Sequence, residues 1–288
     1  MKLQNKKLWI TLFVGPALFF ITLYLLYPSI HTIILSFMGR KSDSFVGLEN
    51  YIYAFTSKTM LTAFTNNLLW LIFFTLFTVG IGLILAILVD RVKYEQIAKS
   101  IIFMPMAISF VGAGVVWKFI YNYKPMGTSQ IGLLNQILVF FGVQPKGWLI
   151  QSPLNNFALI FVGIWIWTGF CMVILSASYK GIPKELMEAG RVDGANEWQV
   201  FRHIILPSMK STIAVVATTM IVNVLKIFDI VYVMTNGNFR TEVIANRMYK
   251  EMFQYRNYGR ASAIAVVLFL VIIPIIVVNI KRMKGDES

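Results

Sequence analysis

Long apolar runs separated by shorter polar connections make up most of the chain. Six runs stand out, with approximate bounds 9–37, 67–89, 101–121, 157–179, 212–234 and 261–280. A helix rises about 1.5 Å per residue, so about 20 apolar residues cross a hydrocarbon core of about 30 Å. Because backbone groups have no water to bond with inside a bilayer, spanning segments of this kind are helical. The pattern therefore predicts an all-α membrane protein with about six transmembrane helices.

The composition agrees with a bilayer environment. Of the 288 residues, 57% are hydrophobic and 14% are charged, against about 25% charged residues in soluble domains. The mean hydropathy is +0.69. The formal net charge of +13 could indicate nucleic-acid binding, but no zinc-finger, helix-turn-helix or RNA-recognition pattern accompanies it. Basic residues in a membrane protein collect at cytoplasmic loops and lipid headgroups, which accounts for this charge.

Neither a disulfide framework nor a metal site is indicated. The single cysteine, Cys171, lies inside an apolar run. The two histidines, His31 and His203, are far apart and have no metal-ligand neighbours. Disulfide scaffolds need paired cysteines, and metal sites need clustered ligands.

The first apolar run is interpreted as a retained anchor rather than a cleaved signal peptide. Lys2, Lys6 and Lys7 precede it, but the run is too long and no A-x-A cleavage site follows. If both termini are cytoplasmic, the inner connections hold 14 of the 26 Lys and Arg residues, the outer connections hold 10, and Lys118 and Lys226 lie within spans. The excess favours cytoplasmic termini by the positive-inside rule.

The last outer connection, residues 242–256, has an amphipathic pattern. Ile244, Met248 and Met252 recur every four residues, and polar side chains lie on the opposite face of a helix. The pattern predicts an amphipathic helix in or near the outer interface, which either covers a central cavity or rests among the headgroups. The predicted polar row comprises Glu242, Asn246, Arg247, Lys250, Glu251 and Gln254.

The segment 181–207, between the fourth and fifth apolar runs, is the one long polar connection on the predicted inner side. Good helix formers occupy 184–192, and Asp193-Gly194 is a turn pair in which glycine allows a positive φ. A second short helix is predicted over 198–205, and Pro207 is expected to move Leu206 out of the helical region. The small residues around the bend make a compact knuckle that could enter a groove on another protein.

The string Glu188-Ala189-Gly190, followed by Asp193-Gly194-Ala195 and Leu206-Pro207, resembles the EAA coupling loop of binding-protein-dependent ABC importer permeases. The resemblance covers about residues 9–280, and two departures are Gly190 in place of a second alanine and Ser211 in place of a common proline. Other matching strings indicate the carbohydrate-uptake branch. These are Phe228-Asp229, Met234-Thr235-Asn236-Gly237 and Tyr258-Gly259-Arg260-Ala261-Ser262-Ala263.

The resemblance implies a fold of the type I ABC importer permease and a single transmembrane domain over residues 1–288. Within it, 9–37 would be the first transmembrane helix, 67–280 would hold a core of five helices, and 181–207 would be the coupling loop. Residues expected to contact the ATPase are Glu188, Ala189, Gly190, Asp193, Gly194, Ala195, Leu206 and Pro207.

The implied partners are an ATPase pair carrying ATP and magnesium, a second permease subunit in a heterodimer, and an external solute-binding protein. The implied location is the bacterial cytoplasmic membrane, with both termini in the cytoplasm. An α-glucoside or oligosaccharide is the expected substrate, and a glycerol phosphate or a polyol stays open as an alternative.

Catalysis and ATP binding by this chain itself are not expected. No G-x-x-x-x-G-K-[ST] phosphate loop, H-E-x-x-H motif or G-x-S-x-G motif occurs. The energy source is therefore a separate chain, and no cofactor is expected here. A secondary transporter is a competing hypothesis, but no inverted repeat is evident and Asp229 is the only carboxylate within a predicted span. A membrane-embedded enzyme would need clustered His, Asp or Glu, which the sequence lacks.

Polar and aromatic residues in the fourth and fifth spans are the candidates for a substrate pathway. Charged residues inside a span cost about 2.5–3.5 kcal/mol on insertion scales, so they should face protein, water or a partner. Lys226 and Asp229 are three residues apart and could pair on one helical face, either as a packing element or in contact with substrate. Aromatic faces pack on sugar rings, and amides bond hydroxyl groups. The candidates are Trp165, Thr168, Gly169, Met172, Asn223, Lys226 and Asp229.

Overall fold

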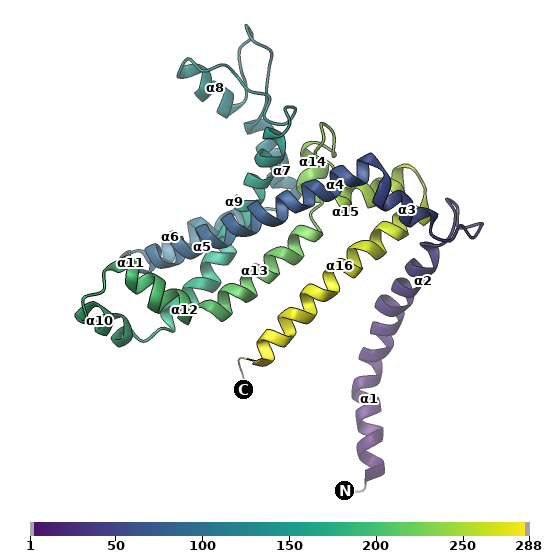
Figure 1. Ribbon diagram of the computed structural model, residues 1–288, viewed down its shortest axis with the longest axis horizontal. Helices are drawn as coiled ribbons and strands as arrows, with labels where there is room; N and C mark the ends of the chain where they lie inside the picture. Colours follow the sequence, from purple (N-terminus) through teal and green to yellow (C-terminus); the bar gives the residue numbers. More distant parts are fainter. Residues whose placement is uncertain (1–2, 286–288) are drawn as a thin grey trace. The chain divides into compact units, whose positions relative to one another are not determined.

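The computed structural model describes residues 3–285, and their regular structure is helical (Figure 1). Within that range the sole β pairing is an isolated bridge between Met38 and Phe45. The chain divides into two compact units. The first contains the described part of Met1–Ser57 together with Arg247–Leu270, and the second contains Lys58–Asn246 together with the described part of Val271–Ser288.

The first unit begins with a long apolar helix. Helix α1 (Leu3–Ile21) continues through a π-helical turn at Thr22–Leu26 into α2 (Tyr27–Leu35). No described side chain of Leu12–Leu35 is buried, which is the pattern expected of a helix that is apolar all round and lies in lipid. Helix α3 (Glu49–Thr56) and the start of α16 (Tyr258–Gly285) complete this unit.

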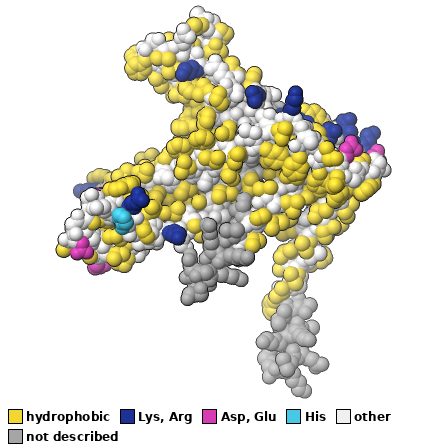
Figure 2. Space-filling view, in the orientation of Figure 1, with side chains coloured by type: hydrophobic (Ala, Val, Ile, Leu, Met, Phe, Trp, Pro, Cys, Tyr) yellow, Lys and Arg dark blue, Asp and Glu magenta, His cyan; other side chains and the backbone are white. Residues whose placement is uncertain are grey.

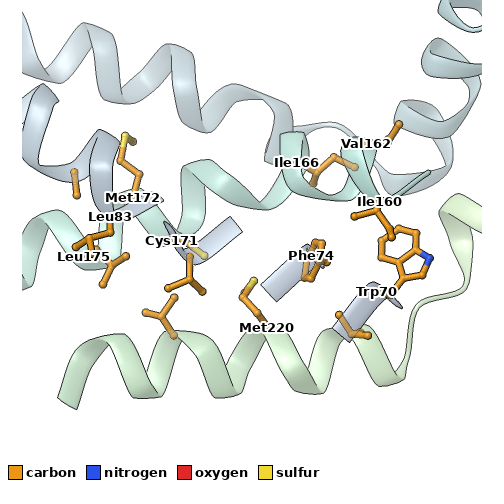
Figure 3. Close-up of a cluster of buried hydrophobic side chains, with 14 of the residues drawn as sticks. Trp70, Phe74, Leu83, Ile160, Val162, Ile166, Cys171, Met172, Leu175 and Met220 are labelled. Carbon is orange, nitrogen blue, oxygen red and sulfur yellow. The ribbon is translucent and has the colours of Figure 1, made fainter. Parts of the chain in front are cut away.

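The second unit is organised around helix α9 (Leu154–Lys180), which packs against α5 (Thr75–Asp90), α6 (Glu95–Phe103) and α13 (Lys210–Leu225). Helix α4 (Lys58–Leu69) leads into α5 through a π-helical turn at Trp70–Phe74. Figure 3 shows the core that these helices enclose. Its fully or nearly fully buried side chains include Trp70, Phe74, Ile160, Ile166, Met172, Leu175 and Met220.

The remaining helices of the second unit lie near the two ends of this bundle. They are α7 (Phe110–Ile120), α8 (Leu133–Phe140), α10 (Lys184–Val192), α11 (Glu197–Val200), α12 (Leu206–Ser208), α14 (Asp229–Met234) and the first part of α15 (Ile244–Tyr249). Hydrophobic side chains cover much of the visible bundle surface, and charged side chains gather around α10–α12 (Figure 2). This distribution is typical of a protein whose middle lies in lipid.

The all-α, multi-span fold predicted from the sequence is confirmed. Within the described residues, three continuous helices are long and apolar enough to span, namely Leu12–Leu35, Lys58–Asp90 and Leu154–Lys180. Two helix pairs also qualify if each bent pair counts as one span, Glu95–Ala107 with Phe110–Ile120 and Glu197–Ser208 with Lys210–Leu225. The sixth predicted segment corresponds to α16, whose described apolar part is shorter.

The third predicted span is a bent pair rather than a single helix. Its halves meet at 95°, after a 3₁₀ turn at Met104–Ala107 that contains Pro105. Ile108 is extended, and the hydroxyl of Ser109 accepts a hydrogen bond from the Gly112 N–H to start α7. Proline lacks the donor that a continuing helix needs, and serine is a favoured N-cap, so the sequence contains both signals for this break.

The expectation of one helix over 212–234 was wrong. Helix α13 ends at Leu225, α14 begins at Asp229, and Phe228 between them has φ −141° and ψ −62°. No proline or glycine lies in this break, so it has no local sequence signal. The expected effect of Pro207 was also wrong, because Leu206 is helical at φ −60° and the 71° bend comes at Met209 instead.

The helix predicted over 242–256 is present, and much of its polar face is buried. The helix is α15 followed by a π-helical turn at Lys250–Gln254. Glu242, Asn246 and Glu251 are buried, whereas Phe253 is 65% exposed. The polar side chains bond to one another along the helix, Asn246 to Glu242 and Arg247 to Glu251. These bonds give the buried polar side chains hydrogen-bond partners within the protein, so they do not require water.

Candidate functional site

Helix α10 ends in a glycine-dependent turn. The Ala195 N–H donates to the Gly190 carbonyl at 3.0 Å, and the Gly194 N–H donates to the Arg191 carbonyl at 3.1 Å. Gly194 has φ +88°. This pair of bonds is the Schellman motif, in which a left-handed glycine follows the helix and satisfies its last carbonyls. The turn predicted from Asp193-Gly194 is confirmed.

A reciprocal cap starts the second helix of this segment. The Gln199 N–H donates to the Asn196 side chain at 2.9 Å, and the Asn196 N–H donates to the Gln199 side chain at 2.8 Å. This is a capping box, which fixes the direction in which the chain leaves the bend. The sequence analysis did not single out Asn196, although the N-x-x-Q spacing carries the signal.

Glu197 ties the bend to the end of α5. Its carboxylate lies 2.8 Å from Nε of Arg191 on α10 and 3.0 Å from Nη2 of Arg91 just beyond α5. All three side chains are about half exposed. The bend between α10 and α11 is therefore held by backbone bonds, and its ion pairs connect it to a long helix of the bundle.

Six of the eight predicted coupling residues lie on α10 and the bend that follows it, the other two, Leu206 and Pro207, begin α12, and most of the eight are exposed. Gly190 and Ala195 are half-buried, while the other six, Glu188, Ala189, Asp193, Gly194, Leu206 and Pro207, are exposed. In the part of the chain that the structure describes, neither the Glu188 nor the Asp193 carboxylate accepts a hydrogen bond from another side chain. Large apolar side chains on the same segment, which the sequence analysis missed, are also exposed. They are Leu186 at 48%, Val192 at 86% and Trp198 at 64%. Exposed apolar groups among polar ones are typical of a protein-binding surface.

The break between α13 and α14 borders a cavity of about 230 Å³, here called the α13–α14 cavity. Its lining is aromatic on one side and mixed polar and apolar on the other. The lining residues are Trp70, Phe74, Phe110, Trp167, Asn223, Val224, Lys226, Ile227, Phe228, Asp229 and Ile230. Non-helical backbone within a membrane span is tolerated where it is covered by protein or lines a water-filled cavity. The break between α13 and α14 thus lies where non-helical backbone is tolerated.

Three predicted pathway residues, Asn223, Lys226 and Asp229, line this cavity. Lys226 is exposed, and Asn223 and Asp229 are half-buried. The expected pairing of Lys226 with Asp229 on one helix is absent from the described structure, because α13 ends at Leu225, just before Lys226, and Asp229 begins α14. Both charged side chains are available to the cavity instead.

The four predicted residues of α9 do not line the α13–α14 cavity. The Thr168 hydroxyl donates to the Ile164 carbonyl, Gly169 is packed against the backbone of Ile102 and Phe103, and Met172 is fully buried. Trp165 meets Trp117 edge to face at 5.5 Å. These contacts place the four residues in helix packing.

Trp167 is the residue of α9 that lines the cavity. Its ring stacks on Phe110 with centroids 5.9 Å apart and an interplanar angle of 22°. Trp70 also lines the cavity, is fully buried, and has an indole N–H with no acceptor among the described residues. Flat aromatic faces beside an amide, an ammonium and a carboxylate suit a ligand with apolar C–H faces and many hydroxyl groups.

Three comparisons identify the chain. The family described as "Binding-protein-dependent transport system inner membrane component" matches residues 78–283. The osmoprotective compounds uptake permease protein GgtC of Synechocystis sp. is 59% identical, over 96% of this chain and 99% of that protein. The alpha-glucoside transport system permease protein AglF of Rhizobium meliloti is 49% identical, over 96% of this chain and 83% of that protein.

A solved structure agrees on the fold. A chain of a bacterial ABC transporter involved in the import of alginate superposes with a TM-score of 0.84, at 22% identity, over 97% of this chain and 96% of that one. The family matches more than half of the sequence, and both relatives align nearly from end to end. The chain therefore belongs to the inner-membrane components of binding-protein-dependent transport systems, the permease subunits of ABC importers.

Proposed function

We propose that this permease carries a small α-glucoside, delivered by an external binding protein, across the membrane. The observation that carries the proposal is the lining of the α13–α14 cavity. Trp167 and Phe110 offer stacked aromatic faces, and Asn223 and Asp229 offer hydrogen-bonding groups for hydroxyls. Both relatives named above are uptake permeases, one for alpha-glucosides and one for osmoprotective compounds.

A phosphorylated substrate suits the same cavity less well. Lys226 could bind a phosphate, but Asp229 lines the same cavity of about 230 Å³. Inside so small a cavity the Asp229 carboxylate would repel a phosphate group, and charge repulsion is a common means of rejecting a ligand. A simple polyol would use the polar groups but would leave the aromatic faces without a ring to pack on. These considerations favour an uncharged glucoside over both alternatives.

As a member of this family, the chain is the membrane component and works with a binding protein and a separate ATPase. The finer assignment is that the eight predicted coupling residues, together with Val192 and Trp198, enter a groove of the ATPase. Moving a two-state equilibrium from 99:1 to 1:99 takes about 5.5 kcal/mol of differential binding. ATP-driven closure at the bend and docking of the loaded binding protein on the opposite side would supply it. In the proposed arrangement both termini lie on the ATPase side, and a second permease subunit completes a heterodimer.

Reconstitution of the complete importer in liposomes tests the proposal. With the binding protein outside and ATP inside, radiolabelled trehalose or maltose should accumulate, and excess methyl α-glucoside should compete. Glycerol 3-phosphate and sorbitol should not compete. Uptake of glycerol 3-phosphate instead would overturn the substrate assignment, and accumulation without ATP would overturn the coupling assignment.

A further inference from the structure

A second and larger cavity lies at the other end of α14. It has a volume of about 650 Å³ and is here called the α14-end cavity. One wall comes from the end of α7 and the following residues, a second from the chain before α9, and a third from α14 and the loop after it. The lining residues are Lys118, Tyr121, Asn122, Tyr123, Gly147, Leu149, Ile150, Tyr232, Val233, Met234, Thr235, Asn236, Asn238 and Phe239.

The chemistry of this lining resembles that of the α13–α14 cavity. Four aromatic rings, those of Tyr121, Tyr123, Tyr232 and Phe239, alternate with three side-chain amides. No carboxylate occurs among these described lining residues, and the one cation, Lys118, donates to the Val233 carbonyl at 3.3 Å. Rings and neutral amides suit an uncharged polyhydroxylated ligand better than an ion.

One buried amide holds two of the walls together. The Asn135 side chain, fully buried, donates to the carbonyls of Asn122 and Lys146 at 2.9 and 3.1 Å. Its oxygen accepts from the Lys146 N–H at 2.9 Å and from the Trp148 indole at 3.1 Å. These bonds fix the segment that carries Tyr123 against the segment that carries Leu149. A preformed cavity of this kind loses little entropy on binding a ligand.

The third wall is also fixed, at some cost in backbone strain. Asn236 and Phe239 have positive φ values of 50° and 55°. The Asn155 side chain, fully buried on α9, donates to the Phe239 carbonyl at 2.7 Å. Non-glycine residues hold such conformations only when their surroundings enforce them, and strain of this kind clusters at ligand sites.

A stacked pair of rings joins the two cavities. Phe228 lines the α13–α14 cavity and Tyr232 lines the α14-end cavity. Their centroids are 5.0 Å apart and their planes are inclined by 24°. Helix α14 has only six residues, so its two ends are about 9 Å apart at the usual helical rise. Aromatic surface thus extends along one short helix from one cavity to the other.

We propose that the α14-end cavity is a second carbohydrate subsite, which takes the glucosyl ring before it reaches the α13–α14 cavity. The proposal rests on the proposed function, because it assumes that the solute carried is a glucoside. Tyr123 and Phe239 would pack on the faces of the ring, and Asn122 and Asn238 would bond its hydroxyl groups. Tyr232 and Phe228 would present aromatic faces on the way from one subsite to the other.

Photo-labelling of the reconstituted importer tests the location. The probe is an α-glucopyranoside bearing an alkyl diazirine, and adducts are assigned to residues by tandem mass spectrometry. Adducts at 121–123 or 232–239 that excess methyl α-glucoside suppresses are the expected result. Adducts confined to residues of the α13–α14 cavity would overturn the second subsite and leave the proposed function intact. An importer that takes up no α-glucoside and gives no adduct would overturn both.

Variants separate sugar binding from protein docking. Tyr123→Ala and Asn238→Ala should each raise the KM for trehalose about three- to tenfold, while Tyr123→Phe should stay near the wild-type value. Phe141→Ala, at an exposed aromatic residue outside the cavity, is the matched control and should change nothing. If Tyr123→Ala and Asn238→Ala instead weaken capture of the sugar-free binding protein, the cavity is a docking surface and the proposal is wrong.

Discussion

Gly190 lies directly against the side chain of Ile204, where the two arms of the bend meet. A methyl group on Gly190 would come within 2.6 Å of the Cδ1 atom of Ile204. The glycine that departs from the usual coupling-loop pattern is therefore matched to a larger residue on the other arm. The close approach of α10 to the π-helical turn at Phe201–Ile205 depends on this pair.

Replacing Gly190 with alanine should destabilise the bend by about 1 kcal/mol, because the added methyl must displace Ile204. The double variant Gly190→Ala with Ile204→Val removes the clashing methyl and should recover most of the loss. Thermal unfolding of the purified permease in detergent measures both. Ala189→Ser, at an exposed neighbouring position, is the control. A double variant no more stable than Gly190→Ala would contradict the assigned contact.

Substitutions at Gly194 can distinguish the effect of backbone strain from the effect of blocking contact with the ATPase. Its φ is +88°, and no atom lies within 4 Å of the position that a Cβ would take. Gly194→Ala should cost about 1–2 kcal/mol from the left-handed conformation alone. Asparagine tolerates that conformation but adds bulk, so Gly194→Asn should fold nearly as well as the wild type and still lose the ATPase on co-purification. Retention of the ATPase by Gly194→Asn would place the contact elsewhere.

Glu197 is expected to matter for coupling more than for folding. Its ion pairs with Arg91 and Arg191 are about half exposed, and pairs of this kind contribute little to stability. Glu197→Gln should therefore leave the thermal midpoint almost unchanged and lower the amount of sugar moved per ATP hydrolysed. The charge reversal Glu197→Arg with Arg91→Glu should restore part of that ratio. An unchanged ratio in Glu197→Gln would show that the link to α5 has no role in coupling.

A buried cluster in the first unit should set much of the stability of that unit. Arg247 lies 2.6 Å from both Glu251 and the Tyr53 hydroxyl, and Tyr53 donates to Glu251 at 2.7 Å. Glu251 is 1% exposed. Glu251→Ala leaves the Arg247 charge without its partner and should cost about 3–5 kcal/mol. Thermal unfolding in detergent measures this cost, and Glu49→Ala, at an exposed carboxylate of the same unit, is the control.

The same cluster gives a pH dependence with a definite sign. Burial, reinforced by the hydrogen bond to Glu251, raises the pKa of the Tyr53 phenol above its usual value near 10. The folded state thus holds this proton more tightly than the unfolded state. The contribution of the Tyr53 phenol to the stability of the fold is therefore complete below pH 10 and is lost as the pH rises through the raised pKa. Tyr53→Phe should cost about 1 kcal/mol at neutral pH. Its difference from the wild type should shrink in alkali, whereas Tyr24→Phe on the exposed first helix should show no difference at either pH.

The sequence predicted features whose signals are local. The apolar runs located the spans, and Asp193-Gly194 located the turn that ends α10. The break at Lys226–Phe228 was missed because no residue there is a helix breaker. The break lies beside a cavity formed with other helices, and periodicity within one helix carries no information about such a cavity.

The side of a membrane helix that faces a cavity is difficult to predict for a related reason. On α9 the sequence analysis chose Trp165, but the residue that lines the cavity is Trp167, two positions and about 200° further round the helix. In the segment 242–256 four residues of the polar row are buried, Glu242, Asn246, Lys250 and Glu251, and Glu251 pairs with Arg247. A membrane helix can be apolar on all sides, so hydrophobicity alone does not show which face meets a neighbour.

The contrast between Asn223 and Asp229 provides the sharpest test of the substrate. If Asn223 bonds a sugar hydroxyl, Asn223→Ala removes one neutral hydrogen bond and should raise the KM for trehalose about two- to tenfold. Asp229→Asn keeps the hydrogen-bonding capacity but removes the charge, so it should retain glucoside uptake and admit competition by glycerol 3-phosphate. Thr218→Ala, also on α13, removes a hydroxyl that donates to the Ala214 carbonyl and should leave both properties unchanged. Competition by glycerol 3-phosphate that is already present in the wild type would show that Asp229 does not exclude anions, and would remove the argument for an uncharged substrate.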